Sequence, residues 1–184
     1  MHRALAILCP LVVLASAGAI GCSSTSSPPP SQCASGAVSF SKDVIPALQM
    51  SCTMSMSCHG QMDNSLVESL YLGPNMGAAT TADVQAVYRG LVGVPAKEDP
   101  SMKLVTKGDL QNSFLWHKVN DDQTTLNKGT LASGCAKASM MCQDCSSSAP
   151  CGGTMPYLSE PLAMTFPQSL CAIESWIQQG AQNN

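Results

Sequence analysis

Near residue 55, two cysteines are followed directly by a histidine. Cys52 and Cys58 lie on either side of a short Ser- and Met-rich stretch, and His59 comes next. Two thiols can form thioethers to the two vinyl groups of a porphyrin, and an adjacent imidazole can then ligate the iron. These residue types in this order predict covalent attachment of one haem c through Cys52 and Cys58, with His59 as an iron ligand.

The spacing of the two cysteines departs from the usual pattern, in which two residues separate them. Here five residues lie between Cys52 and Cys58. Six steps along a regular helix would leave the thiols about 120° apart around its axis, so a helix would not present both to one porphyrin edge. We therefore expect residues 53–57 to form a loop that bulges from the helix, with His59 starting the next helical turn.

Hydrophobic spacing predicts an all-α protein, with no convincing strand alternation and no internal repeat. A first helix is expected to begin near Ser39 or Ser41 as N-cap, with Pro46 in its first turn. The last helix, introduced by residues 165–169, carries an apolar stripe and ends at Gly180. Between them, Thr80 or Thr81 would cap a helix over 82–91, and an amphipathic helix is expected over 114–119.

The N-terminal residues are typical of an exported lipoprotein. Residues 1–21 have a positive start and an apolar run of signal-peptide length, and small residues precede Cys22. Cleavage would make Cys22 the lipidated N-terminus, anchored to the cell envelope on the periplasmic side or in the outer membrane. Residues 22–38 would then be a Ser- and Pro-rich tether, with the folded part starting near Cys33. The alternative is a transmembrane anchor, which the short run and Pro10 disfavour.

Export makes the cysteines informative, because thiols outside the cytoplasm usually oxidise to disulfides. Of ten cysteines, Cys9 leaves with the signal peptide and Cys22 would take lipid, which leaves eight. Haem at Cys52 and Cys58 would leave six for three bridges, whereas a haem-free chain would form four. Four cysteines fall in a Ser- and Cys-rich insertion, residues 131–153, where structural disulfides are expected. Zinc or redox chemistry at its Cys142-x-x-Cys145 pair is the alternative.

Composition limits the remaining possibilities. The net charge is −3 and the basic residues are scattered, so no nucleic-acid patch is indicated. Residues 39–184 are long enough for one domain with a modest core, and only 4% of all residues are aromatic, which favours support from a cofactor and disulfides. No paired carboxylates, nucleophile motif or phosphate-binding loop stands out. An enzyme is therefore the least favoured class.

The order of the motifs resembles that of the c-type cytochrome domains common in exported proteins of myxobacteria and planctomycetes. The resemblance covers about residues 39–182. It is carried by Phe40–Pro46 leading into Cys58-His59-Gly60, Tyr88–Val94, Gly108-Asp109 with Ser113–Val119, Met155-Pro156, and Trp176–Ala181.

This resemblance implies a small cytochrome c-like helical domain around one haem, with unidentified redox proteins as partners and no catalytic residues. It implies that His59 is the proximal ligand, that Met155 is the distal ligand, and that Trp176 packs near the haem edge. A neutral thioether ligand favours ferrous iron and suits electron transfer. Other residues remain possible as the distal ligand: Met140, Met141, Met164 and His117.

Two other interpretations stay open at this stage. A haem-free relative could keep the fold, join Cys52 to Cys58 in a disulfide and serve a structural or binding role. An enzyme could instead use an open distal haem side or a metal bound in the Cys135–Cys151 segment.

Overall fold

The computed structural model describes residues 33, 36–55, 58–62, 70–126, 153–156 and 159–184, and this part of the chain is helical. In place of strands, its loops contain isolated β-bridges, such as Val92 with Val105. The expected all-α class is confirmed for these residues. The elements follow in the order η2 (Phe40–Val44), α1 (Ile45–Cys52), α2 (Thr81–Leu91), α3 (Phe114–Val119), η4 (Gln123–Leu126), α4 (Leu162–Thr165) and α5 (Pro167–Gln178).

The first helix begins where the sequence predicts it. Ser39 is the N-cap of the π-helix η2: its hydroxyl accepts from the Lys42 N–H, and its own N–H donates to the Asp43 carboxylate at 2.7 Å. Pro46 follows in the first turn of α1, where a missing N–H costs little. The apolar face expected of this helix is entirely buried: Phe40, Val44, Ile45 and Leu48.

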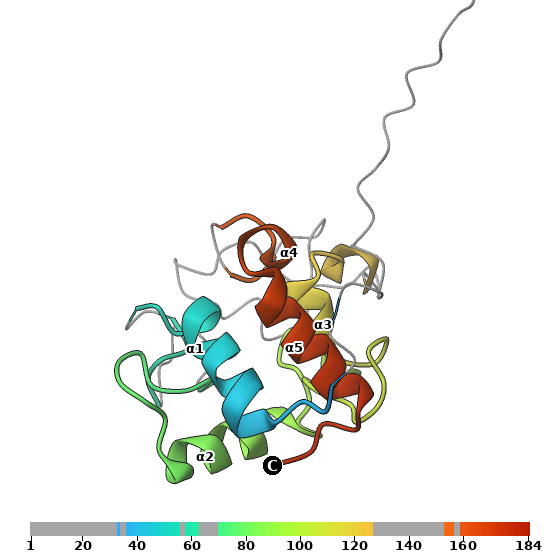
Figure 1. Ribbon diagram of the computed structural model, residues 1–184. Helices are drawn as coiled ribbons and strands as arrows, with labels where there is room; N and C mark the ends of the chain where they lie inside the picture. Colours follow the sequence, from blue (N-terminus) through green and yellow to red (C-terminus); the bar gives the residue numbers. More distant parts are fainter. Residues whose placement is uncertain (1–32, 34–35, 56–57, 63–69, 127–152, 157–158) are drawn as a thin grey trace, which may run out of the picture.

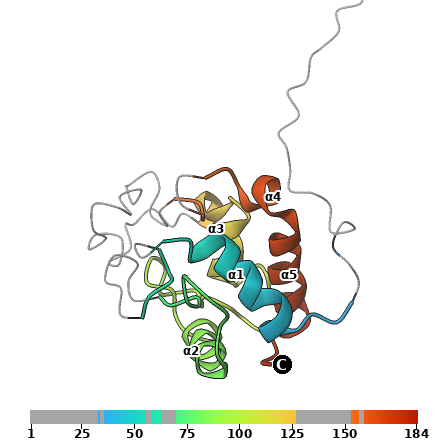
Figure 2. The ribbon, with the colours of Figure 1, turned by 60° about the vertical axis from the view of Figure 1, so that its left-hand side comes forward.

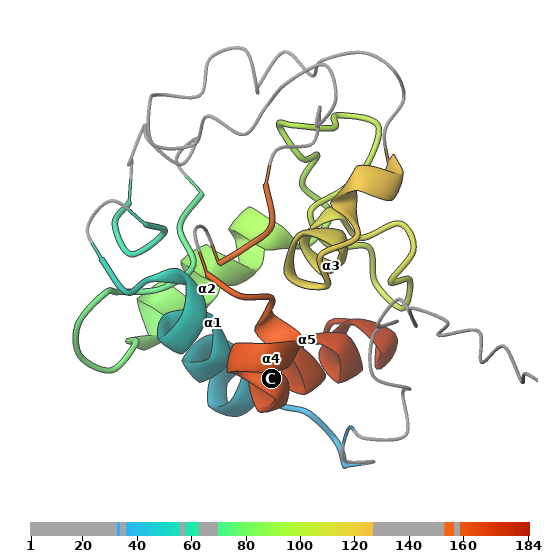
Figure 3. The same ribbon diagram turned by 90° about the horizontal axis from the view of Figure 1, so that it is seen from above.

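The core is centred on the packing of η2 and α1 against α5, which lie side by side in Figures 1 and 3. The Trp176 ring of α5 stacks on Phe40 with ring centroids 4.8 Å apart, and its Nε1 donates to the Gln182 carbonyl at 2.8 Å. The predicted stripe of α5 is buried with it: Leu170, Ile173, Trp176 and Ile177. Gly180, just after the helix, has a φ of +95°, which suits a glycine cap.

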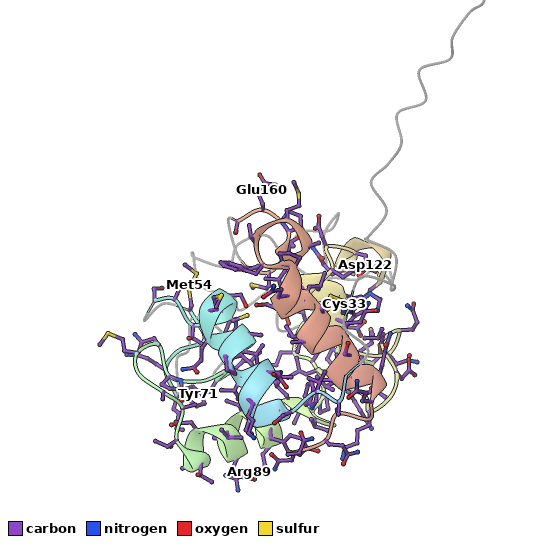
Figure 4. All side chains as sticks on the ribbon, viewed as in Figure 1. Cys33, Met54, Tyr71, Arg89, Asp122 and Glu160 are labelled. Atoms are coloured by element: carbon purple, nitrogen blue, oxygen red, sulfur yellow. A yellow bond between two sulfur atoms is a disulfide. The ribbon has the colours of Figure 1, made fainter. Side chains whose placement is uncertain are left out.

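Thr80 is the N-cap of helix α2, which confirms the prediction, and α2 lies below α1 in Figure 2. Thr80 and Asp83 form a reciprocal capping box. The Tyr71 hydroxyl donates to the same Asp83 carboxylate at 2.6 Å, and Figure 4 shows Tyr71 between α1 and α2. The segment that follows the cysteine loop is thereby fixed to the start of α2.

Helix α3 differs from the amphipathic helix expected over 114–119. Its bounds agree, but all six of its side chains are buried, because loop 92–113 covers one side and α5 the other. Lys118 is buried with them, and its Nζ lies 3.6 Å from Glu98 Oε1. The short α4 and η4 were not expected from the sequence.

Residues before the first helix are attached to α5. Cys33 forms a disulfide with Cys171, 138 residues away in sequence. The Gln179 side chain accepts from the Val38 N–H and donates to the Gly36 carbonyl, both at 2.9 Å. The end of the expected tether therefore belongs structurally to the domain.

Three expectations lie outside the described residues: the signal peptide with Cys22, most of the tether, and nearly all of the insertion at 131–153 with its four cysteines. In the described part, none of the helices is both long enough and apolar enough to cross a membrane.

Replacing both Cys33 and Cys171 with Ala is expected to lower the free energy of unfolding by about 2–5 kcal/mol, because the bridge closes a very long loop of the unfolded chain. Urea unfolding followed by tryptophan fluorescence measures this loss. An unchanged unfolding midpoint would contradict a stapling role for this disulfide.

Candidate functional site

The candidate site is built around a loop that begins where α1 ends. The helix terminates at Cys52, and Thr53 is its C-cap. The Thr53 hydroxyl oxygen lies 3.1 Å from the Gln49 carbonyl oxygen and 3.2 Å from the Pro74 carbonyl oxygen, within hydrogen-bonding distance of both. The chain then leaves the helical path, and the His59 N–H donates to the Cys52 carbonyl at 3.1 Å. Residues 53–55 are not helical, as expected for this loop, and residues 56–57 lie outside the described part. The hydrogen bond brings the His59 backbone back beside Cys52.

Residues 58–60 form a turn, so the expectation that His59 starts a helical turn is wrong. The Cys58 N–H donates to the Ser55 carbonyl at 3.0 Å, and His59 and Gly60 follow directly. Leu72, farther along the chain, lies beside this turn, and its N–H donates to the His59 carbonyl at 2.9 Å.

The two sulfur atoms of the motif have different surroundings. Cys52 is buried and carries a free thiol, so it is not joined to Cys58. Burial raises the pKa of the Cys52 thiol to about 11; the Ser51 hydroxyl, 3.3 Å away, opposes the rise, and the nearby Cys58 adds to it. Cys58 is partly exposed, and its Sγ lies 3.2 Å from Ser55 Oγ.

The His59 ring is oriented through one nitrogen. Its Nδ1 lies 2.9 Å from the Leu70 carbonyl oxygen, which only accepts, so Nδ1 carries the proton and Nε2 keeps its lone pair. Burial lowers the pKa of His59, the Leu70 hydrogen bond opposes this, and the charge of Lys118 lowers it further. A neutral imidazole held by a backbone carbonyl is the arrangement that metal-ligating histidines commonly show.

Gly60 has no room for a side chain. A Cβ at this position would lie 2.4 Å from Asn75 Cβ and 3.0 Å from the Thr53 carbonyl oxygen. Glycine therefore lets the turn pack directly on the segment around Asn75. The glycine of the Cys-His-Gly sequence therefore has a structural role, because it permits this close contact between the two backbone segments.

Met155 is held beside the end of α3. Its N–H donates to the Lys118 carbonyl at 2.8 Å, and its bond to Pro156 is cis. The preceding Thr154 donates from its hydroxyl to Asp121, and its N–H lies 3.0 Å from the Gln123 side-chain oxygen once that amide is turned to satisfy its partners. Hydrogen bonds to three residues thus fix two consecutive residues of this segment.

Lys118 links the two candidate iron ligands. Its carbonyl holds Met155, and its ammonium charge acts on His59. Lys118 therefore has one interaction with each of these residues, through its backbone and through its charge. These interactions could not be predicted from the sequence, because Lys118 lies in a helix that was expected to have a solvated face.

Trp176 occupies a packing position in the contact between η2 and α5, with its indole nitrogen satisfied by Gln182. Its position near a haem edge stays a prediction.

The other candidate distal ligands divide into two groups. His117 is buried, with Nδ1 2.7 Å from Asp122 Oδ1 and Nε2 3.1 Å from the Gln111 carbonyl, so both ring nitrogens are engaged. This confirms it as a satisfied histidine, although it is not at the surface. Met164 is 72% exposed on α4. Met140 and Met141 lie outside the described residues.

Comparisons with known proteins add no relative. No family model matches the chain, and neither the curated proteins nor the solved structures contain a significant match. Among the described residues there is also no group of three or more His, Cys, Asp and Glu side chains that could hold a metal ion.

Substituting Gly60 with Ala is expected to destabilise the domain by about 1–3 kcal/mol, because the added methyl group would collide with Asn75 and the Thr53 backbone. Gly90→Ala is the matched control: it lies inside α2 with nothing within 4 Å of its Cβ position, so it should stabilise by about 0.5–1 kcal/mol. Thermal unfolding of both variants gives the comparison. Equal effects would show that Gly60 is not tightly packed.

In protein made without haem, acid is expected to destabilise the domain through His59. Its folded pKa lies below the unfolded value of about 6.5, so the unfolded chain binds the proton more readily and stability falls as pH drops below about 6.5. His59→Asn keeps an amide donor for the Leu70 carbonyl but cannot titrate. Urea unfolding at a series of pH values from 7.5 down to about 5 should show a shallower decline for this variant, and parallel curves would contradict the assignment.

Proposed function

We propose that this protein binds one covalent haem c and transfers single electrons. The observation that supports this best is the hydrogen bond from the His59 N–H to the Cys52 carbonyl. It returns the His59 backbone to the end of α1, beside Cys52, despite the five residues between the two cysteines.

The proximal residues fit a haem c in chemical type. Cys52 and Cys58 would form the thioethers, and His59 would present Nε2 while Leu70 holds Nδ1. The two sulfur atoms are near enough for the charge of one to affect the other, yet they are not bonded to each other.

On the distal side, Met155 is the candidate that we favour. Its N–H donates to the carbonyl of Lys118, whose charge also acts on His59, and Thr154 is anchored beside it. His117 has no ring nitrogen left to offer. With His59 and Met155 both bound, the iron would exchange electrons and leave no site for a substrate, so the proposed protein is a carrier rather than an enzyme.

The haem-free alternative requires a Cys52–Cys58 disulfide, and the structure does not contain that bond. The Cys33–Cys171 bridge supports an oxidising compartment, as expected for an exported protein. We therefore propose that the domain acts in the cell envelope, anchored by lipid on Cys22, and that its partners are other redox proteins.

Met155→Ala tests the distal assignment. The haem should stay attached, since the thioethers would be formed by Cys52 and Cys58. Loss of the Met155 sulfur ligand should give a high-spin spectrum and a lowered reduction potential. Met164→Ala removes an exposed methionine and should change neither. A low-spin spectrum in Met155→Ala would reject Met155 as the ligand.

The haem assignment itself is tested by producing the mature chain in a host with cytochrome c maturation machinery and staining the denatured, gel-separated protein for haem-dependent peroxidase activity. Wild type should stain. A Cys52→Ala, Cys58→Ala double variant should not, because no thioether can form. An unstained wild-type band would reject the proposed function.

A further inference from the structure

The exposed apolar side chains of this protein are of one kind. Among the described residues, every large hydrophobic side chain that is exposed is a methionine: Met50 (55%), Met54 (69%), Met62 (54%), Met76 (82%) and Met164 (72%). No leucine, isoleucine, valine or aromatic residue is among them. Leucine would provide apolar contact equally well at these positions. The feature that distinguishes the five side chains from leucine is the thioether sulfur.

Four of the five lie around the end of α1. Met50 is in the last turns of α1, and Met54 follows four residues later, just beyond the C-cap, where Figure 4 shows it at the end of the helix. Met62 comes two residues after Gly60, and Met76 directly follows Asn75. Gly60 packs against Asn75, so the backbones that carry Met62 and Met76 are adjacent.

Hydrogen bonds fasten the Met76 segment to α1 as well. The Gln49 side chain donates to the carbonyls of Pro74 and Gly77, at 3.0 and 3.1 Å, on both sides of Met76. Thr53 donates to the same Pro74 carbonyl. Since Gln49 precedes Met50 and Thr53 precedes Met54, the four methionines project from one connected patch of backbone. Each has three rotatable side-chain bonds, so several sulfur atoms can converge on one point.

The surroundings favour a soft, singly charged ion. The described residues 49–55, 58–62 and 70–82 contain no Lys, Arg, Asp or Glu, so the carboxylates nearest to the four methionines in sequence are those of Asp63 and Asp83, just outside these segments. Thioethers are soft, neutral donors that select Cu(I), whereas carboxylates and carbonyls suit Mg²⁺, Ca²⁺ and Mn²⁺. We propose that Met50, Met54, Met62 and Met76 form a surface site that binds Cu(I) through their sulfur atoms.

This site does not depend on the haem assignment. Cys52 is buried, and its sulfur is not at the surface that the four methionines share. Binding involves no change in oxidation state: Cu(I) exchanges its previous ligands for thioethers. The proposal therefore applies to the protein with or without haem, and the two claims can fail separately.

The test is an anaerobic competition between the mature protein and a Cu(I) chelator, with the metal measured after separation. Wild type should retain Cu(I). The Met50, Met54, Met62 and Met76→Leu quadruple variant keeps the apolar surface but lacks the sulfur atoms, and its Kd should rise at least about tenfold. Met164→Leu, which removes an exposed methionine from α4, should bind as wild type does. Circular dichroism confirms that the variants fold.

A second measurement identifies the ligands directly. In protein labelled with ¹³C at the methionine methyl groups, Ag(I), a closed-shell substitute for Cu(I), should shift the signals that disappear in the quadruple variant and leave the Met164 signal in place. Repeating both measurements with Cys52→Ala, Cys58→Ala protein separates thioether from thiol binding. Equal affinities of wild type and the quadruple variant, or binding that vanishes with the two cysteines, would overturn the proposal.

Discussion

The candidate site depends on one hydrogen bond, from the His59 N–H to the Cys52 carbonyl. A regular helix through this segment would separate the two thiols by about 120° around its axis. Here the helix ends at Cys52, and the His59 N–H returns to the Cys52 carbonyl, so the motif does not follow a regular helical path. The rest of the loop supports that closure: Thr53 caps the helix, Leu70 orients the imidazole, and Gly60 lets the turn pack on Asn75.

Two packing arrangements stabilise the fold around the candidate site. One is the contact of η2 and α1 with α5, centred on Phe40 and Trp176 and reinforced by the disulfide that ties Cys33 to α5. The other is the buried helix α3, whose Lys118 carbonyl holds Met155. A small chain with few aromatic residues has a limited core, so a disulfide that spans most of its length and a cofactor would both contribute to its stability.

Much of the scaffold could be predicted from the sequence, because caps and apolar stripes are local signals. The Ser39 and Thr80 caps, the buried face of the first helix and the stripe of α5 follow from residues a few positions apart. Burial of all α3 side chains could not be predicted, since it results from loop 92–113 folding back on the helix and from α5 packing on it. The positions of Leu70, Asn75 and Lys118 around the site likewise depend on contacts between remote segments. The assignment of Met155 over other methionines rests on the resemblance and stays a prediction, and the structure adds the hydrogen bond from its N–H to the Lys118 carbonyl.

The most direct test is the mass of one tryptic peptide of the mature wild-type protein made in a host that matures c-type cytochromes. No Lys or Arg lies between Lys42 and Arg89, so residues 43–89 are released as a single fragment that contains Cys52, Cys58 and His59. We expect this fragment to be heavier by one haem, with neither cysteine available to an alkylating reagent. A fragment lighter by two hydrogens would mean a Cys52–Cys58 disulfide, and a fragment alkylated at both cysteines would mean unreacted thiols. Either result would contradict covalent haem attachment.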